Sequence, residues 1–146
     1  MKAIKNFEEF ITEKIVKIQA PNKSRAKYLL NEAEKTHSFL LQKLKMFEIN
    51  DKNANDFVKS CYDIIMEAIR AKMLLDGYNA QGLGAHEAEV AYLRKLKMSE
   101  KDIQFLDQLR YFRNGMLYYG TLIDKEYAEK VIKFLKKIYP LLLKLI

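Results

Sequence analysis

Helical periodicity is the feature of this sequence that most constrains its fold. Apolar side chains recur every three to four residues along most of the chain, and no useful length alternates with period two. This spacing marks one face of an α-helix, and proline, glycine and an Asn/Asp-rich run divide the pattern into segments. It predicts helices over residues 4–18, 24–47, 54–76, 85–97, 99–120 and 125–139. We therefore expect an all-α fold, an antiparallel (up-and-down) bundle of about five to six helices.

Length and composition favour one ordered domain over residues 1–146. The chain has 146 residues, only five glycines and two prolines, and one cysteine, so its core must hold without a disulfide. Cys61 falls at an apolar helical position, which predicts a buried thiol. We expect no metal and no cofactor, because neither histidine belongs to an acidic or cysteine ligand set at a suitable spacing.

The two ends of the sequence bear on localisation. Charges occur throughout residues 1–14, with no apolar run typical of a signal peptide. The apolar run over residues 139–146 is far too short to span a bilayer. These patterns predict a cytoplasmic protein without membrane contact.

The net charge indicates an anionic partner. The formal charge is +7 and the pI about 9.3, which suits nucleic acid, a nucleotide or an acidic protein. Much of the excess is lysine on solvent faces, and such surfaces also form ion-pair networks. Lys130, Lys133, Lys136 and Lys137 make the outer face of the last helix. This face is either simply solvated or a patch for nucleic acid or a partner.

The stretch over residues 109–120 carries a charged residue in an unusual place. On a helix, Arg113 falls within the apolar sector, where a guanidinium is costly unless it is paired or opens into a cleft. Arg110, Asn114 and Tyr118 step along the neighbouring polar stripe. We therefore expect a functional site centred on Arg113.

The segment Arg113-Asn114-Gly115-Met116-Leu117-Tyr118 resembles the signature of HEPN domains, the helical "higher eukaryotes and prokaryotes nucleotide-binding" family. In that family an arginine, usually followed by Asn or Asp, precedes a histidine by four to six residues. Tyr118 stands where the histidine is expected. Residues 74–96, LLDGYNAQGLGAHEAEVAYLRKL, are similar to the family's Gly-Tyr loop and to the helix that opens with His-Glu.

The resemblance implies a helical protein that acts on RNA or nucleotides. Active members cleave RNA without metal, the arginine binding the phosphate and the histidine moving protons. Their cleft commonly lies between the two subunits of a dimer, and many members pair with a minimal nucleotidyltransferase. The resemblance makes Arg113, Asn114 and Tyr118 the candidate catalytic residues. The resemblance, together with the polar stripe next to Arg113, gives these candidate nucleotide- or RNA-binding residues: Arg110, Tyr119, His86 and Glu67.

Tyr118 changes the expected chemistry. A phenol titrates at about pH 10 and is a poor base at neutral pH. We therefore predict a homodimeric protein that binds a nucleotide or RNA, or a nucleotidyltransferase partner, without strong catalysis. By resemblance, Tyr118 and Tyr119 are also candidates for nucleotide attachment by that transferase. One alternative is an endoribonuclease toxin of a toxin–antitoxin pair, in which Tyr118 replaces the histidine.

A second alternative is a purely structural interaction domain. In that case Arg113 closes a buried salt bridge, with Glu67 or Asp63 of the 54–76 helix as the best partners. Those carboxylates could instead pair with Lys59 and Arg70 along their own helix. His86, in the first turn of its helix, is either a structural histidine or a contributor to the cleft. The 54–76 helix is apolar over much of its circumference. It must therefore either lie at the centre of the bundle or face the core on one side and a subunit interface on the other.

Overall fold

The computed structural model describes residues 3–118 and 123–146, with no side-chain description for residues 116–118. It confirms the all-α fold. A short helix α1 (Phe7–Thr12) precedes the bundle helices α2 (Lys23–Met46), α3 (Ala54–Leu75), α4 (Ala85–Lys95), α5 (Glu100–Tyr118) and α6 (Lys125–Lys144). For five of the six predicted helices, most of the observed first and last residues lie within a few residues of the predicted ones. In the described part of the chain, no helix is both long and apolar enough to cross a membrane.

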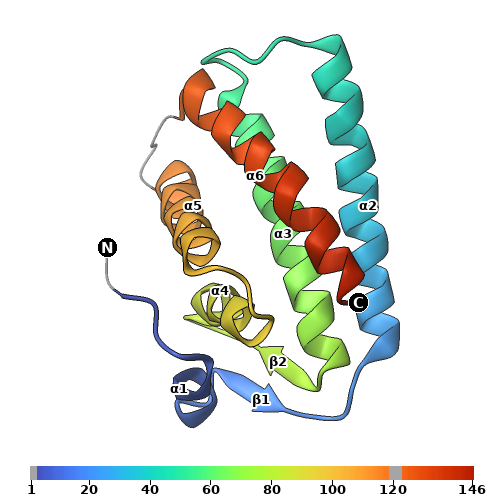
Figure 1. The fold of residues 1–146 in the computed structure, drawn as a ribbon, viewed down its shortest axis with the longest axis vertical. Helices are drawn as coiled ribbons and strands as arrows, with labels where there is room; N and C mark the ends of the chain where they lie inside the picture. The colour runs from blue at the N-terminus through green and yellow to red at the C-terminus, as the bar shows by residue number, and fades with distance from the viewer. Residues whose placement is uncertain (1–2, 119–122) are drawn as a thin grey trace.

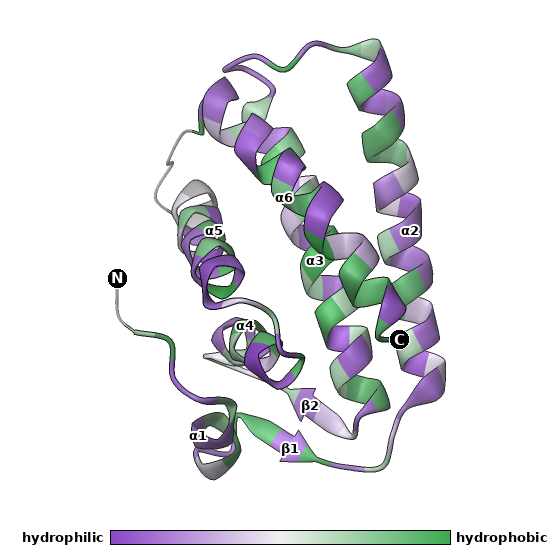
Figure 2. Ribbon diagram, in the orientation of Figure 1, coloured by the Kyte–Doolittle hydropathy of each residue, from purple (hydrophilic) through white to green (hydrophobic). Residues whose placement is uncertain are grey.

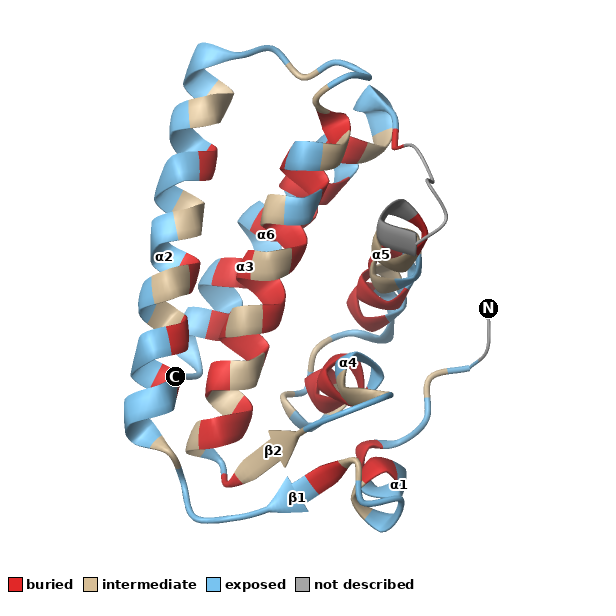
Figure 3. Cartoon of the chain, turned by 180° about the vertical axis from the view of Figure 1, so that it is seen from behind, coloured by how far each residue is buried: buried red, intermediate tan, exposed pale blue. Residues whose placement is uncertain are grey.

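Helix α3 is the centre of the bundle. It packs against α2, α4, α5 and α6 (Figure 1), and buried positions run along its whole length (Figure 3). The apolar surface that covers most of the circumference of α3 is buried by other helices of the same chain. This surface therefore gives no argument for a dimer. Cys61 is buried here, as predicted, and burial raises the pKa of its thiol to about 12.

The predicted first helix is wrong beyond Thr12. The chain leaves the helix at Lys14, whose φ is +63°, and forms the strand β1 (Val16–Ile18). This strand pairs antiparallel with β2 (Tyr78–Ala80), with Val16 opposite Ala80 and Ile18 opposite Tyr78. The physical reason is a cluster of β-branched residues, Ile15, Val16 and Ile18, which suit a pleated strand once a partner is available. That partner comes from a distant segment, so local periodicity could not reveal it.

Gly77 follows the end of α3 in the left-handed conformation. Its φ is +89°, and a Cβ added there would lie 2.7 Å from the carbonyl oxygen of Gln19. Gly77 also accepts a backbone hydrogen bond from Gln19 at 2.9 Å. The close approach of the two segments therefore requires glycine, beyond the requirement set by φ.

We expect Gly77→Ala to lower the free energy of unfolding by about 3 kcal/mol, because it adds a backbone clash to a strained φ. Gly82→Ala is the matched control, since Gly82 has a φ of +78° and nothing within 4 Å of its added Cβ. Gly82→Ala should lower the free energy of unfolding by about 1 kcal/mol, because only the left-handed φ disfavours alanine there. Urea denaturation of both variants checks this, and equal losses would show that the Gln19 contact is unimportant.

The sequence predicted that the last helix ends at residue 139, before Pro140, and this prediction is wrong. Helix α6 continues through Pro140 to Lys144. Proline removes one helical hydrogen bond, but Tyr139 and Leu142 on either side are buried in the core. Packing on α3 therefore holds the turn that propensity disfavours. Side chains cap the first turns of α6 and α5: Tyr127 N–H donates to Asp124 at 2.9 Å, and Asp102 N–H donates to Ser99 at 3.2 Å.

Candidate functional site

Helices α3, α4 and α5 enclose a pocket of about 250 Å³ that contains the arginine singled out by the sequence. We call it the Arg113 pocket. Its lining residues are Tyr62, Asp63, Met66, Glu67 and Arg70 of α3, His86 of α4, and Arg113 and Asn114 of α5. The structure thus brings together four predicted site residues from three separate helices. Helix α3 supplies both polar side chains and the core residues Tyr62 and Met66 to this lining.

Arg113 has no hydrogen-bond partner for two of its nitrogen atoms among the described residues. Its Nε and Nη1 are buried and unsatisfied, and its guanidinium carbon lies 6.0 Å from the centre of the Tyr62 ring. Such a distance permits a cation–π contact, which compensates only part of the lost hydration. Arg113 is thus a partly buried cation with two hydrogen-bond donors left unused among the described residues.

The salt bridge proposed for Arg113 is absent from the described part of the chain. No ion pair within 4.0 Å joins it to Asp63 or to Glu67, and Oε2 of Glu67 is itself buried without a partner. The closed structural pairing predicted as an alternative is therefore not formed. The pocket instead contains a cation and a carboxylate that each keep capacity for a ligand.

Two carboxylates of the pocket have perturbed pKa values. Burial raises the pKa of Asp63, although the charge of Arg113 works against this. Burial also raises the pKa of Glu67, and the negative charge of Asp63 adds to the rise. The two side chains lie one turn apart on α3, so the charge of Asp63 disfavours ionisation of Glu67.

The raised pKa of Glu67 predicts a pH-dependent effect of Glu67→Gln. Because the folded state binds the proton more tightly than the unfolded state, ionised Glu67 lowers stability, and stability recovers as pH falls through the raised pKa. Glu67→Gln should therefore raise the melting temperature at pH 7. The gain should vanish at about pH 4, where the unfolded carboxyl is also protonated. Glu126→Gln, at an exposed site on α6, should show no such dependence.

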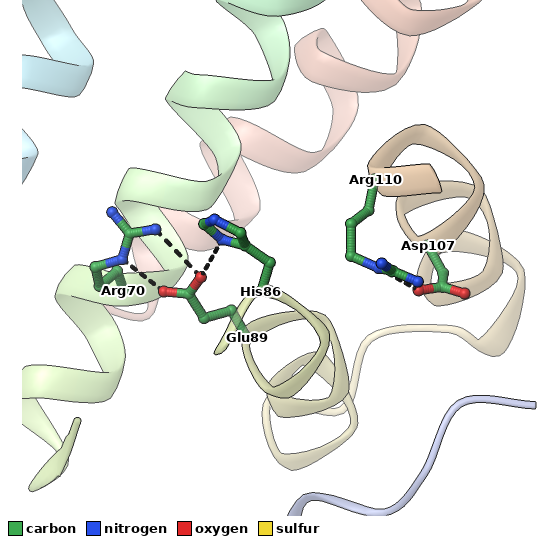
Figure 4. A network of polar contacts seen from close by, with 5 residues as sticks. All are labelled: Arg70, His86, Glu89, Asp107 and Arg110. Carbon is green, nitrogen blue, oxygen red and sulfur yellow. Dashed lines mark hydrogen bonds and ion pairs between the residues drawn. The ribbon is translucent and has the colours of Figure 1, made fainter. Parts of the chain in front are cut away.

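A second cluster, not predicted from the sequence, holds His86 at the edge of the Arg113 pocket (Figure 4). Glu89 of α4 accepts two hydrogen bonds from Arg70, at 2.5 and 3.2 Å. Its Oε1 also lies 2.9 Å from Nδ1 of His86. Glu89 is only 1% exposed. Burial works to lower the pKa of Arg70, but the hydrogen bond and charge of Glu89 outweigh it and raise that pKa. Arg70 therefore pairs across helices, and the pairing along α3 suggested by the sequence is not formed.

The sequence did carry a weak signal for Glu89. It follows His86 by three residues, a spacing that places two side chains on the same helical face. Its neighbours Ala88, Val90 and Ala91 are all buried, so a carboxylate at that position needed a cationic partner. Only the packing of α3 on α4 identifies that partner as Arg70.

The Arg113 pocket adjoins a larger polar pocket of about 570 Å³. The two share Arg70 and His86, and the larger one is also lined by Arg25 and by the loop through Gly82. Three arginines from α2, α3 and α5 thus border one connected polar surface. A chain of phosphates could contact several of them at once.

The other predicted residues lie elsewhere. Arg110 donates to Asp107 at 2.9 Å and lies 3.8 Å from Glu87, lining a different pocket of about 390 Å³. Figure 4 shows this pair apart from the Arg70–Glu89–His86 cluster. The side chain of Tyr118, and Tyr119 entirely, fall outside the described residues.

Comparisons with protein-family models, with curated proteins and with solved structures each found no match for this chain. The site must therefore be interpreted from its own chemistry. Across residues 3–118 and 123–146, no group of three or more His, Cys, Asp or Glu side chains could hold a metal ion. The groups that the Arg113 pocket does offer are a forked cation, an amide, an imidazole and unpaired carboxylate oxygens.

Proposed function

We propose that this protein binds the phosphate of a nucleotide or of RNA in the Arg113 pocket. The observation that carries the proposal is the partly buried guanidinium of Arg113, two of whose nitrogens are buried and have no partner among the described residues. A planar guanidinium binds two phosphate oxygens at once. The free energy lost in burying this cation is recovered when such an anion enters.

The remaining groups of the pocket favour a nucleotide over a simple anion. Glu67 offers an unpaired oxygen that can accept a hydrogen bond from a ribose hydroxyl or a base amino group. Asn114 can both donate and accept. The connected polar pocket, with Arg25 and Arg70, gives room for a neighbouring phosphate. A ligand with both anionic and hydrogen-donating parts fits this mixture.

The same proposal includes the wider expectations drawn from the sequence. We place the chain among HEPN-like proteins, acting in the cytoplasm as a homodimer or beside a minimal nucleotidyltransferase. Support comes from the helical fold and from the meeting of Arg113, Asn114 and His86 in one pocket. Analytical ultracentrifugation measures the oligomeric state directly.

The test is a binding titration with two fluorescent probes, labelled ATP and a short labelled single-stranded RNA, followed by anisotropy. Unlabelled nucleoside mono-, di- and triphosphates and inorganic phosphate then compete for the site. We expect nucleotides to compete better than inorganic phosphate, because they also engage Glu67 and Asn114. Absence of binding by both probes at low salt would reject the proposal.

A second candidate function, metal-independent RNA cleavage, is favoured by the position of His86. The resemblance assigned proton transfer to the position of Tyr118, but His86 supplies an imidazole in the same pocket as Arg113. Glu89 holds its Nδ1, which leaves Nε2 to exchange a proton. In the reaction, the ribose 2′-oxygen loses its proton and bonds to phosphorus while the bond to the 5′-oxygen breaks. Nε2 of His86 would take the 2′ proton and return it to the departing 5′-oxygen, so the products are a 2′,3′-cyclic phosphate and a 5′-hydroxyl. Arg113 would stabilise the charge that develops on the phosphate.

For this second candidate, His86→Gln is expected to lower cleavage of a labelled single-stranded RNA in EDTA by roughly 100-fold or more. Tyr118→Phe should change the rate little, since His86 carries the proton. The assay compares initial rates at equal protein concentration, with Lys27→Gln on the exposed face of α2 as control. A wild-type protein that binds RNA without cleaving it would eliminate the nuclease and leave the binding function. Cleavage gained only with Tyr118→His would show that His86 cannot replace the missing group.

A further inference from the structure

A groove between α5 and α6 is separate from the Arg113 pocket and shares none of its residues. It has a volume of about 610 Å³. We call it the lysine groove, and its lining residues are Lys101, Asp102, Gln104, Phe105, Gln108, Lys130, Lys133, Phe134 and Lys137. Helices α5 and α6 both pack on α3 (Figure 1), and each contributes side chains to the lining of the groove.

The rim of the lysine groove is cationic and only partly compensated. Lys137 pairs with Asp102 at 2.8 Å, and Lys130 lies 3.8 Å from Glu126. Lys101 and Lys133 take part in no ion pair within the described ranges. Four lysines and one aspartate thus line the groove. Such a surface attracts an anionic partner and repels a second copy of a chain with charge +7.

The floor of the groove is apolar and already packed within the molecule. The Phe105 ring lies 4.6 Å from that of Phe134 and stacks with Tyr127 at 6.2 Å and 16°. Phe134 is only 7% exposed. The ring faces on which a nucleobase would stack are therefore engaged by neighbouring side chains. Apolar surface remains for an inserted aliphatic or aromatic side chain.

The spacing of the lysines suits a helical partner. Lys130, Lys133 and Lys137 follow one side of α6 at positions i, i+3 and i+7, and polar and apolar residues alternate along this helix in Figure 2. These positions span about 10 Å, or roughly two turns. An acidic helix laid along the groove can match this row with carboxylates at the same period.

From these observations we propose that the lysine groove docks an acidic amphipathic helix of a partner protein. A large apolar side chain of that helix would rest on the apolar floor formed by Phe105 and Phe134, and its carboxylates would meet Lys101, Lys130 and Lys133. This interaction does not depend on the function proposed for the Arg113 pocket. A single-stranded nucleic acid is the competing occupant, and the groove's engaged ring faces argue against it.

The test begins with selection of a displayed library of random peptides, each about four helical turns long, against the full chain. The enriched peptides are then labelled and titrated by anisotropy against the variants. We expect acidic sequences with one or two large apolar residues. Lys130→Glu combined with Lys133→Glu should weaken their binding at least tenfold. The matched control, Lys27→Glu with Lys45→Glu on exposed positions of α2, makes the same charge change away from the groove and should alter binding less than twofold.

A second variant separates docking from general charge attraction. Gln104→Trp fills the groove from an exposed position of α5 without changing charge, and it should also weaken binding about tenfold. Circular dichroism confirms that each variant is folded. The proposal is overturned if no acidic peptide is enriched, or if binding is indifferent to the groove variants. It is also overturned if the double lysine variant binds labelled single-stranded RNA more weakly than the wild type does but binds every peptide equally well.

Discussion

Replacing Arg113 with methionine is expected to weaken nucleotide and RNA binding roughly 100-fold while leaving the folded protein at least as stable as the wild type. Methionine has a similar length and no charge, so it can occupy the same space beside Tyr62. The substitution removes two buried nitrogen atoms that lack partners among the described residues. The free energy of unfolding should stay level or rise by about 1 to 2 kcal/mol.

Binding should respond in the opposite direction. Loss of charge-assisted hydrogen bonds to a phosphate costs about 1.5 to 3 kcal/mol for each good contact, which predicts roughly 100-fold weaker binding. Anisotropy titration and urea denaturation on the same samples measure the two effects together. Arg113→Lys keeps the positive charge but loses the planar guanidinium that binds two phosphate oxygens. Its affinity should therefore lie between that of Arg113→Met and that of the wild type.

Opposite changes in stability and binding are typical of a residue retained for function. If Arg113→Met destabilised the protein by several kcal/mol, Arg113 would have a structural role that its described contacts do not reveal. If it left the affinity unchanged, the phosphate site would lie elsewhere. The polar pocket lined by Arg25 and Arg70 would then be the next place to test.

Much of the bundle could be predicted because its long helices are patterned locally. Helices α2 and α3 begin and end within about two residues of the predicted bounds, and the caps at Ser99 and Asp124 use side chains close in sequence. The errors lie where distant segments decide the local structure. Pairing with β2 converts residues 16–18 into a strand, and packing on α3 carries α6 through Pro140.

The same distinction applies to the candidate site. A charged residue on an apolar helical face marks Arg113 from one segment alone, and the structure places its partly buried guanidinium in a pocket. Its surroundings could not be predicted in the same way. The partner of Arg70 is Glu89, 19 residues away on another helix, and both Arg110 and Asp107 turn to a different pocket. Side-chain pairing across helices depends on rotation about each helix axis, which periodicity fixes only coarsely.

Glu89→Leu should be the most destabilising single substitution in the site. It leaves the partly buried Arg70 without its two hydrogen bonds and removes the partner of His86 Nδ1. Loss of one member of a buried ion pair costs about 3 to 5 kcal/mol, which lowers the melting temperature by about 10 °C for a chain of this size. Thermal unfolding followed by circular dichroism measures the change. Glu129→Leu, at an exposed position of α6 whose paired lysine lies 3.8 Å away, is the control for the substitution itself and should cost far less.

The double variant Arg70→Met with Glu89→Leu separates the structural role of this cluster from a chemical one. Removing both charges leaves no uncompensated ion, so most of the lost stability should return, to within about 1 kcal/mol of wild type. His86 would nevertheless lack the carboxylate that orients its ring. If His86 moves protons in RNA cleavage, the rate should remain low in the stable double variant. If the rate recovered with stability, Glu89 would serve the fold alone, and His86 would act without a fixed orientation.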